Sequence, residues 1–300
     1  MRKINSPLAD FAENNIKIIY LIPCIVFLLC MVVFPLGYTI YMSLTDWTMS
    51  SVRGPKFIGL ANFVKLFKDK SFISSIKITV KYSVIALIIE IILGTCLALM
   101  LNRKKLFLRN VSKTIMLIPM TMTPVAVGMI WKLLMDPAIG LFNLIAKQMG
   151  FAPSEWLGST GSVLGSLILI DVWEWTPMVS LIILAGLSSI PDDIYEAATV
   201  DGASYLQKTL KITVPMTLNT ILTAALLRMI DVLKTFDIIY STTAGGPKFM
   251  SQTINIYSYL YGFQYYKYGY ASASMVVFTL LVLAVAGLVM YIRAKAVVDR

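Results

Sequence analysis

Long apolar runs alternate with short polar segments along almost the whole chain of 300 residues. A helix needs about 20 mostly apolar residues to cross a hydrocarbon core of ~30 Å. Runs long enough for this occur at residues 18–44, 78–101, 111–135, 163–187, 216–240 and 272–292. The pattern therefore predicts an all-α integral membrane protein with six transmembrane helices. We expect residues 1–17 to form an N-terminal segment and residues 18–300 to form a single transmembrane domain.

The composition supports a membrane protein. Hydrophobic residues make up 58% of the chain and charged residues 14%, with a mean hydropathy of +0.77; soluble domains carry about 25% charged residues. The first apolar run exceeds the roughly 7–15 residues of a signal-peptide core, and no small-residue cleavage site follows it, so we predict an uncleaved span. In such a chain the net charge of +10 indicates cytoplasmic loops and lipid headgroups rather than nucleic acid.

Lysine and arginine predict the orientation, because both are enriched in cytoplasmic loops. The short loop 102–113 carries five basic residues: Arg103, Lys104, Lys105, Arg109 and Lys113. Short loops count most in this rule, so the N-terminus and the C-terminus are both expected in the cytoplasm. Segment 190–215 is then also expected in the cytoplasm, whereas segments 45–77, 136–162 and 241–271 are expected outside.

Two of the outer segments have interfacial features. Residues 59–72 are amphipathic and predict a helix lying at the membrane surface. Seven tyrosines follow in the third outer segment: Tyr257, Tyr259, Tyr261, Tyr265, Tyr266, Tyr268 and Tyr270. Tyrosine rings stack on sugars, but tyrosines also gather at membrane interfaces because one end is apolar and the other is polar. We favour an interfacial belt.

Ionisable residues within the predicted spans are candidates for function, because each costs about 2.5–3.5 kcal/mol on insertion scales. Glu90 lies alone in span two, while Asp171 and Glu174 in span four are three positions apart and share a helix face. Span five carries charges of alternating sign at steps of three, so neighbours can pair along the helix: Arg228, Asp231, Lys234 and Asp237.

These charges allow two interpretations. They can pair only to hold helices together, or they can line a polar path between spans four and five, with Glu174 and Arg228 at similar depth. Our candidate substrate pathway consists of Trp173, Glu174, Trp175, Arg228, Asp231, Lys234 and Asp237.

The sequence contains little that supports catalysis. There is no histidine, the usual general base and metal ligand, and no GxxxxGK[ST] phosphate loop. The three cysteines lie in apolar runs without CxxC spacing and are interpreted as small buried hydrophobes. We therefore expect no enzyme activity, no metal site and no cofactor in this chain.

The most distinctive polar segment is residues 190–215, between spans four and five. Pro191, Asp192 and Asp193 predict a helix start, Gly202 interrupts the helix, and Pro215 ends the segment where the next apolar run begins. Its residues match a spaced pattern: Glu196-Ala197-Ala198, three residues, Gly202, nine residues, then Ile212-Thr213-Val214-Pro215.

This spacing resembles the EAA signature of permease subunits of binding-protein-dependent ABC importers, with Val214 in place of the usual leucine. Four further segments resemble the sugar branch of that family, which includes maltose, oligosaccharide and glycerol-phosphate permeases: residues 57–63, 131–143, 171–177 and 236–247. The resemblance extends from about residue 18 to the C-terminus.

The resemblance implies a multi-pass subunit in a bacterial cytoplasmic membrane that imports a carbohydrate. Expected partners are a second permease as a heterodimer, two ATPase subunits that use ATP and Mg, and an external solute-binding protein. The EAA segment would be the coupling helix, and the residues that dock on the ATPase would be Glu196, Ala197, Ala198, Asp201, Gly202 and Pro215.

Two other function classes remain open at the level of sequence. An ion-coupled secondary transporter would use Asp231 and Glu90, although the two halves of the chain show no self-similarity. A membrane-embedded hydrolase would use Asp171, Glu174 and Asp231 without any histidine. The solute is also open, because Glu174 and the tryptophans suit a hydroxyl-rich ligand, whereas Arg228 and Lys234 suit an anionic one.

Overall fold

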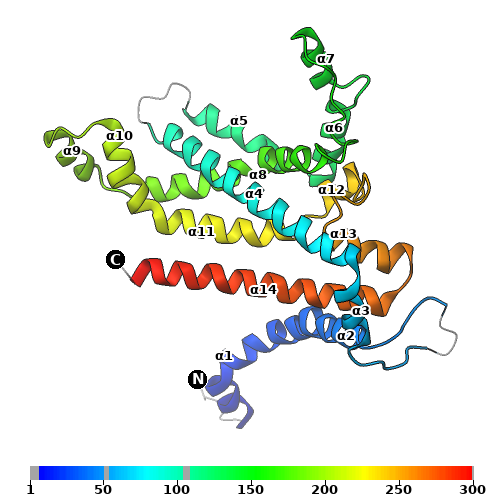
Figure 1. Cartoon of the computed structure of the whole chain (residues 1–300). Coiled ribbons are helices and arrows are strands. Elements are labelled where there is room, and N and C mark those ends of the chain that lie inside the picture. Colours follow the sequence, from blue (N-terminus) through cyan, green and yellow to red (C-terminus); the bar gives the residue numbers. More distant parts are fainter. Residues whose placement is uncertain (1–6, 51–53, 104–108, 299–300) are drawn as a thin grey trace. The chain divides into compact units, whose positions relative to one another are not determined.

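The computed structural model describes residues 7–50, 54–103 and 109–298, and within these ranges every regular element is a helix (Figure 1). The chain divides into two compact units. The first comprises Met1–Leu66 and Tyr261–Val276, and the second comprises Phe67–Leu260 and Val277–Arg300. Five helices of the described chain are long and apolar enough to cross a membrane, and a bent helix pair brings the number to six. The predicted all-α architecture is confirmed.

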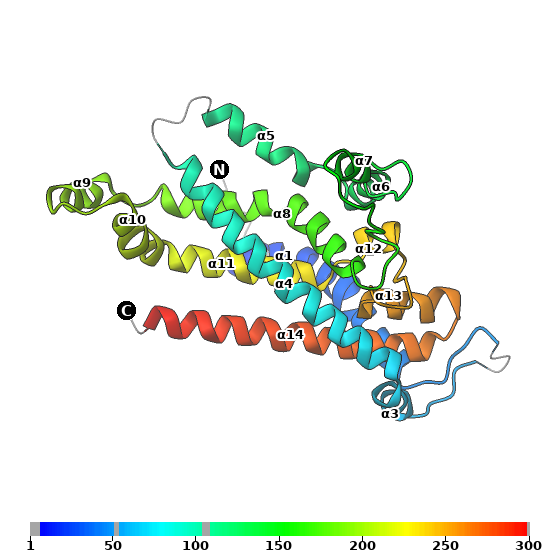
Figure 2. The ribbon, with the colours of Figure 1, turned by 45° about the horizontal axis from the view of Figure 1, so that its top comes forward.

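Three long helices form the centre of the second unit: α4 (Lys70–Leu101), α8 (Val163–Leu187) and α11 (Val214–Leu233). Each packs on the other two, and they lie side by side in both ribbon views (Figures 1 and 2). Two thirds of the most apolar stretch of α8 is buried, so α8 is the core helix. Helices α4 and α8 approach closely, because a methyl group on Gly94 would lie 2.6 Å from Val179 Cγ1.

The stretch predicted as span three is not one straight helix. Helix α5 (Arg109–Thr121) and helix α6 (Pro124–Leu134) are bent by 95° at the break between them. Pro124 is the first residue of α6, and Thr123 before it is extended with ψ 138°. A residue before proline is pushed out of the helical region, and proline offers no amide hydrogen to the preceding turn, which explains the break.

Helix α11 ends at Leu233, before the predicted end of span five at residue 240, and the short helix α12 (Asp237–Thr242) follows. The amide of Asn255 donates to the carbonyls of Leu233 and Thr235, at 3.2 and 3.4 Å. These bonds satisfy carbonyl groups that the ended helix leaves open. Two further short helices of this unit are α7 (Leu141–Gln148) and α13 (Ile254–Tyr259).

The polar segment between α8 and α11 is helical in pieces. It contains α9 (Asp192–Val200), α10 (Tyr205–Lys208) and a π-helical turn, η2 (Thr209–Thr213), which runs directly into α11. Residues Tyr205–Leu233 therefore form one continuous helical stretch of 29 residues.

The first unit contains α1 (Pro7–Leu28), the π-helical turn η1 (Leu29–Val33) and α2 (Phe34–Ser43). The amphipathic stretch near residues 59–72 forms α3 (Ala61–Lys68), with Asn62 and Leu66 buried and Val64 exposed. A π-helical turn, η3 (Leu260–Gln264), precedes α14 (Tyr268–Val298), which begins in this unit.

Candidate functional site

A buried ion cluster joins the three central helices. Arg228 on α11 donates from Nε to Glu90 Oε2 at 2.7 Å and from Nη2 to Glu90 Oε1 at 3.0 Å. The same Nη2 donates to Asp171 Oδ2 on α8. The side chain of Arg228 is 1% exposed and both carboxylates are 0% exposed. Trp175 completes the surroundings, with its ring centre 5.2 Å from the guanidinium carbon.

This cluster shows which of the charges within the spans are partners of Arg228. Arg228 does not pair with Asp231 along its own helix, as the alternating charges suggested; it pairs with carboxylates on two other helices. Within a low-dielectric interior, a charge left without its partner is expensive, so the pairing holds α4, α8 and α11 in one arrangement. Arg228 has a structural role that the sequence interpretation underestimated.

Glu174 lies on the core helix but makes no direct contact with Arg228. Its side chain is fully buried, and neither carboxylate oxygen has a hydrogen-bond partner in the described chain. Asp171 Oδ1 and the hydroxyls of Thr176 and Ser180 on the same helix are also without partners there. Buried polar atoms of this kind are normally bonded to ordered water or to a bound polar group.

The two tryptophans of the predicted pathway point in different directions. Trp173 is 39% exposed and packs on Trp131 of α6, with ring centres 5.5 Å apart. Trp175 faces Arg228 in the interior. Adjacent helical residues differ by about 100° in direction, so Trp173, Glu174 and Trp175 do not line one surface.

The other charges of the predicted pathway are exposed. Asp231, Lys234 and Asp237 all lie on the surface, as does Tyr240, three positions further on. Lys234 Nζ and Asp231 Oδ1 are 3.4 Å apart, with side chains 53% and 45% exposed. Exposed charges at the end of an apolar helix are costly in lipid, so this face must meet water or another chain.

An aromatic cluster includes two residues close to these charges in the sequence, Phe236 and Tyr240. Phe236 stacks on Tyr240 at a centroid distance of 5.2 Å and an interplanar angle of 13°. Tyr259 packs against both rings, and its hydroxyl lies 3.3 Å from the Tyr240 hydroxyl. This hydrogen bond raises the pKa of Tyr259. We call Asp231, Lys234, Phe236, Asp237, Tyr240 and Tyr259 the aromatic–charged face.

The EAA segment forms a short exposed helix with a well-defined end. Asp192 and Asp193 occupy the first turn of α9, where carboxylates favour the positive end of the helix dipole. Gly202 follows α9 with φ +75°, the left-handed conformation that favours glycine. The Ala203 N–H donates to the Ala198 carbonyl at 2.9 Å, and the Gly202 N–H to the Thr199 carbonyl at 3.0 Å, as in a Schellman C-cap.

Most predicted coupling residues are accessible. Glu196, Ala197, Asp201 and Gly202 are exposed, Pro215 is partly exposed, and Ala198 is buried at 8% exposure. Large apolar side chains are exposed beside them: Val200 at 89%, Leu206 at 64% and Leu210 at 59%. The segment therefore presents uncovered apolar surface together with the Glu196 carboxylate.

Polar contacts fix the shape of this segment. A pocket of about 340 Å³ lies between the end of α4 and the α9–α10 segment, with Glu196 in its wall. Lys208 Nζ donates to Thr199 Oγ1 at 2.6 Å, and the Tyr195 hydroxyl lies 3.0 Å from Thr213 Oγ1. The guanidinium of Arg103 lies 5.0 Å from the ring centre of Tyr205.

Sequence reasoning missed several residues that organise the site. Glu90 and Asp171 were recognised as charges within spans but not as the partners of Arg228, because contacts between helices leave no periodic signal in one sequence. Phe236 and Tyr259 were likewise not connected with Tyr240. The tyrosine-rich outer segment was the available signal for the aromatic cluster.

Comparison with known proteins identifies the family. Residues 90–300 match the protein family described as binding-protein-dependent transport system inner membrane component. The chain belongs to this family. It is 37% identical over 268 residues to the probable ABC transporter permease protein y4oQ of Sinorhizobium fredii, covering 89% of this chain and 86% of that protein.

A second relative and a solved structure are also similar to this chain. The trehalose/maltose transport system permease protein MalF of Thermococcus litoralis is 34% identical over 277 residues, covering 91% of this chain and 92% of that protein. The fold matches a chain in the crystal structure of a bacterial ABC transporter involved in the import of the acidic polysaccharide alginate. That match has a TM-score of 0.83 and 24% identity, covering 97% and 99% of the two chains. The chain is thus a membrane permease component of an ABC transport system.

Proposed function

We propose that this chain forms half of the solute pathway of an ATP-driven carbohydrate importer and couples to a separate ATPase through α9. The observation that carries the proposal is the exposed EAA segment. It presents Glu196 and uncovered apolar side chains on a short, capped helix, as a surface that docks in a partner's cleft would.

The proposed assembly contains this chain, a second permease, two ATPase subunits that hold ATP and Mg, and an external solute-binding protein. Both termini and α9 lie in the cytoplasm in this arrangement, in a bacterial cell membrane. The aromatic–charged face of this chain is a suitable surface for the second permease or for the solute pathway. Its charged side chains would be costly to expose to lipid tails.

A carbohydrate solute is supported by this same face. Rings such as Tyr240 stack on the apolar faces of sugars, and the carboxylates of Asp231 and Asp237 accept hydrogen bonds from hydroxyl groups. One relative at 34% identity is named as a trehalose/maltose permease. We therefore propose an oligosaccharide or related glycoside as the transported class.

Purification of the full chain from its native membrane tests the proposal. We expect an ATPase and a second permease to copurify, and reconstituted uptake of labelled glycosides to require both ATP and the solute-binding protein. The matched control is the same assembly supplied with a non-hydrolysable ATP analogue. Uptake by this chain alone in vesicles free of ATP would contradict the proposal and would favour an ion-coupled transporter.

A further inference from the structure

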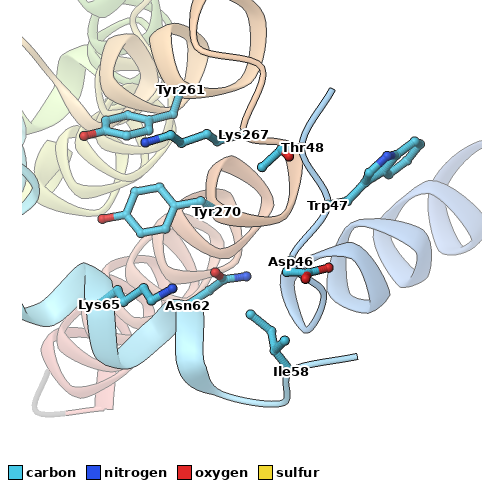
Figure 3. A pocket seen from close by; sticks show the side chains of 9 residues that line it. All are labelled: Asp46, Trp47, Thr48, Ile58, Asn62, Lys65, Tyr261, Lys267 and Tyr270. Atoms are coloured by element: carbon cyan, nitrogen blue, oxygen red, sulfur yellow. The ribbon is translucent and has the colours of Figure 1, made fainter. Parts of the chain in front are cut away.

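The first unit contains a second cavity, which shares no lining residue with the sites described above. It has a volume of about 390 Å³, and its wall includes Asp46, Asn62, Lys65, Tyr261, Lys267 and Tyr270 (Figure 3). These residues come from three places: the segment after α2, helix α3, and the stretch from η3 to the first turn of α14. None of them is needed for coupling or for the aromatic–charged face.

Hydrogen bonds to backbone carbonyl groups connect the segments that form this cavity. Asn62 is 4% exposed, and its Nδ2 donates to the carbonyls of Ser43 and Thr45 at 2.9 and 2.8 Å. The Met49 N–H donates to the Tyr266 carbonyl, and the Gly269 N–H donates to the Trp47 carbonyl, each at 3.0 Å.

Gly269 allows the start of α14 to approach the segment after α2 closely. A methyl group at this position would lie 2.1 Å from the Thr45 carbonyl oxygen, so only glycine permits this approach. The cavity is therefore formed by the fold itself and does not depend on the chance positions of surface side chains.

The charges of the cavity favour an anion. The side chains of Lys65 and Lys267 are exposed, and neither forms an ion pair with a carboxylate in the described chain. The Lys267 ammonium lies 5.7 Å from the ring centre of Tyr261. The acidic residue of the wall, Asp46, already accepts the Lys56 N–H at 2.8 Å through Oδ1. Two ammonium groups can therefore donate to an anionic ligand.

The position of the cavity indicates where this anion comes from. The cavity lies just beyond the end of α2, whose apolar side chains Leu36, Ile40 and Tyr41 are 45–50% exposed. Lys65 is on the amphipathic helix α3, and Lys267 directly precedes the apolar helix α14. Lysine and tyrosine at the ends of apolar helices are typical of the headgroup level of a bilayer.

We propose that this cavity binds the phosphate group of a membrane phospholipid, with Lys65 and Lys267 as the charged donors. The acyl chains would then lie along the exposed apolar surface of α2. This site requires only that the chain spans a membrane, and it does not depend on the transported solute or on the coupling segment.

Native mass spectrometry of the chain, purified with its copurifying subunits, tests the proposal. The probes are phosphatidylglycerol, diacylglycerol with the same acyl chains, and soluble glycerol phosphate. Phosphatidylglycerol should be retained about tenfold more than diacylglycerol, and the double variant Lys65→Gln/Lys267→Gln should lose about tenfold or more of this retention. Lys65→Arg/Lys267→Arg should retain it, and the matched control Lys56→Gln, an exposed lysine outside the cavity wall, should behave as wild type.

Three results would overturn the proposal. Equal retention of diacylglycerol and phosphatidylglycerol would show binding by acyl chains alone. An equal loss in Lys56→Gln would show general attraction to a basic surface. Glycerol phosphate that binds as tightly as the lipid would make this a site for a soluble anion. Unchanged thermal stability of the double variant excludes misfolding as the cause of lost binding.

Discussion

Arg228 on α11 and Glu90 on α4 are 138 positions apart in the sequence, and two hydrogen bonds of 2.7 and 3.0 Å join their buried side chains. Asp171 on α8 shares the same guanidinium. Two carboxylates thus depend on one cation for their compensation, which makes Arg228 the central residue of the helix contact.

Replacing Arg228 with Met should destabilise the protein by about 3–5 kcal/mol, because Glu90 and Asp171 would remain buried without a cation. The measurement is thermal unfolding of the purified assembly in detergent. Met at the exposed Arg103 is the matched control and should have a small effect. The triple variant Glu90→Gln/Asp171→Asn/Arg228→Met should recover most of the lost stability. If Arg228→Met alone unfolds like wild type, the cluster does not hold the helices together.

Gly202 should be sensitive to backbone conformation rather than to side-chain volume. Its φ is +75°, yet an added Cβ would meet no atom within 4 Å. Gly202→Val should therefore cost about 1–2 kcal/mol in backbone strain at the end of α9 and reduce ATP-coupled uptake. Gly202→Asn should retain most uptake, because asparagine tolerates the left-handed region. Paired assays of ATP hydrolysis and uptake in proteoliposomes distinguish the variants, and equal coupling in both would contradict the role of this turn.

If the EAA segment docks on the ATPase as proposed, its exposed apolar residues should contribute to ATPase binding. Burial of a valine or leucine side chain is worth about 1.5–3 kcal/mol, so Val200→Ser and Leu206→Ser should each weaken ATPase association about tenfold or more. Association is measured by titrating the purified ATPase onto the permease. Met149→Ser, at a residue that is 68% exposed on another segment, is the control. If Val200→Ser and Leu206→Ser both bind the ATPase as tightly as wild type, this surface is not part of the interface.

The charges of the aromatic–charged face should affect uptake without affecting stability. The Asp231–Lys234 pair is about half exposed, and exposed ion pairs contribute roughly 0–1 kcal/mol. Asp231→Asn/Lys234→Gln should unfold at nearly the wild-type temperature while the KM for solute uptake rises severalfold. Thr223→Ala, a substitution on the same helix outside the aromatic–charged face, is the control and should leave the KM unchanged. Unchanged uptake kinetics would show that this face does not line the solute path.

The sequence predicts the number and class of the long helices well, because about 20 apolar residues have few alternatives to spanning a bilayer. The start of α9 at Asp192 and the turn at Gly202 were also predictable, since both depend on local capping chemistry. The partners of Arg228 could not be predicted from the sequence. Alternating charges at steps of three suggested pairs within one helix, whereas rotation around the helix axis and packing between helices decide which charges meet.

The break after Thr121 and the end of α11 at Leu233 show a second limit. Hydropathy continues through both points, so an apolar run does not mark them. Pro124 was visible as a proline within a span, but prolines in membrane helices are often tolerated. The hydrogen bonds that close α11 come from Asn255, a residue in a distant segment that no local pattern connects to Leu233.

Because α10, η2 and α11 form one continuous helical stretch, this stretch can rotate as a rigid rod. From Tyr205 to Arg228 the helix axis extends about 35 Å at 1.5 Å per residue. Because Arg228 is fastened to two neighbouring helices, it can act as the pivot. A tilt of about 10° around this pivot would carry the Tyr205 end of the helix sideways by roughly 6 Å. A small change in angle at Arg228 thus corresponds to a large displacement at the EAA segment, where we propose that the ATPase docks.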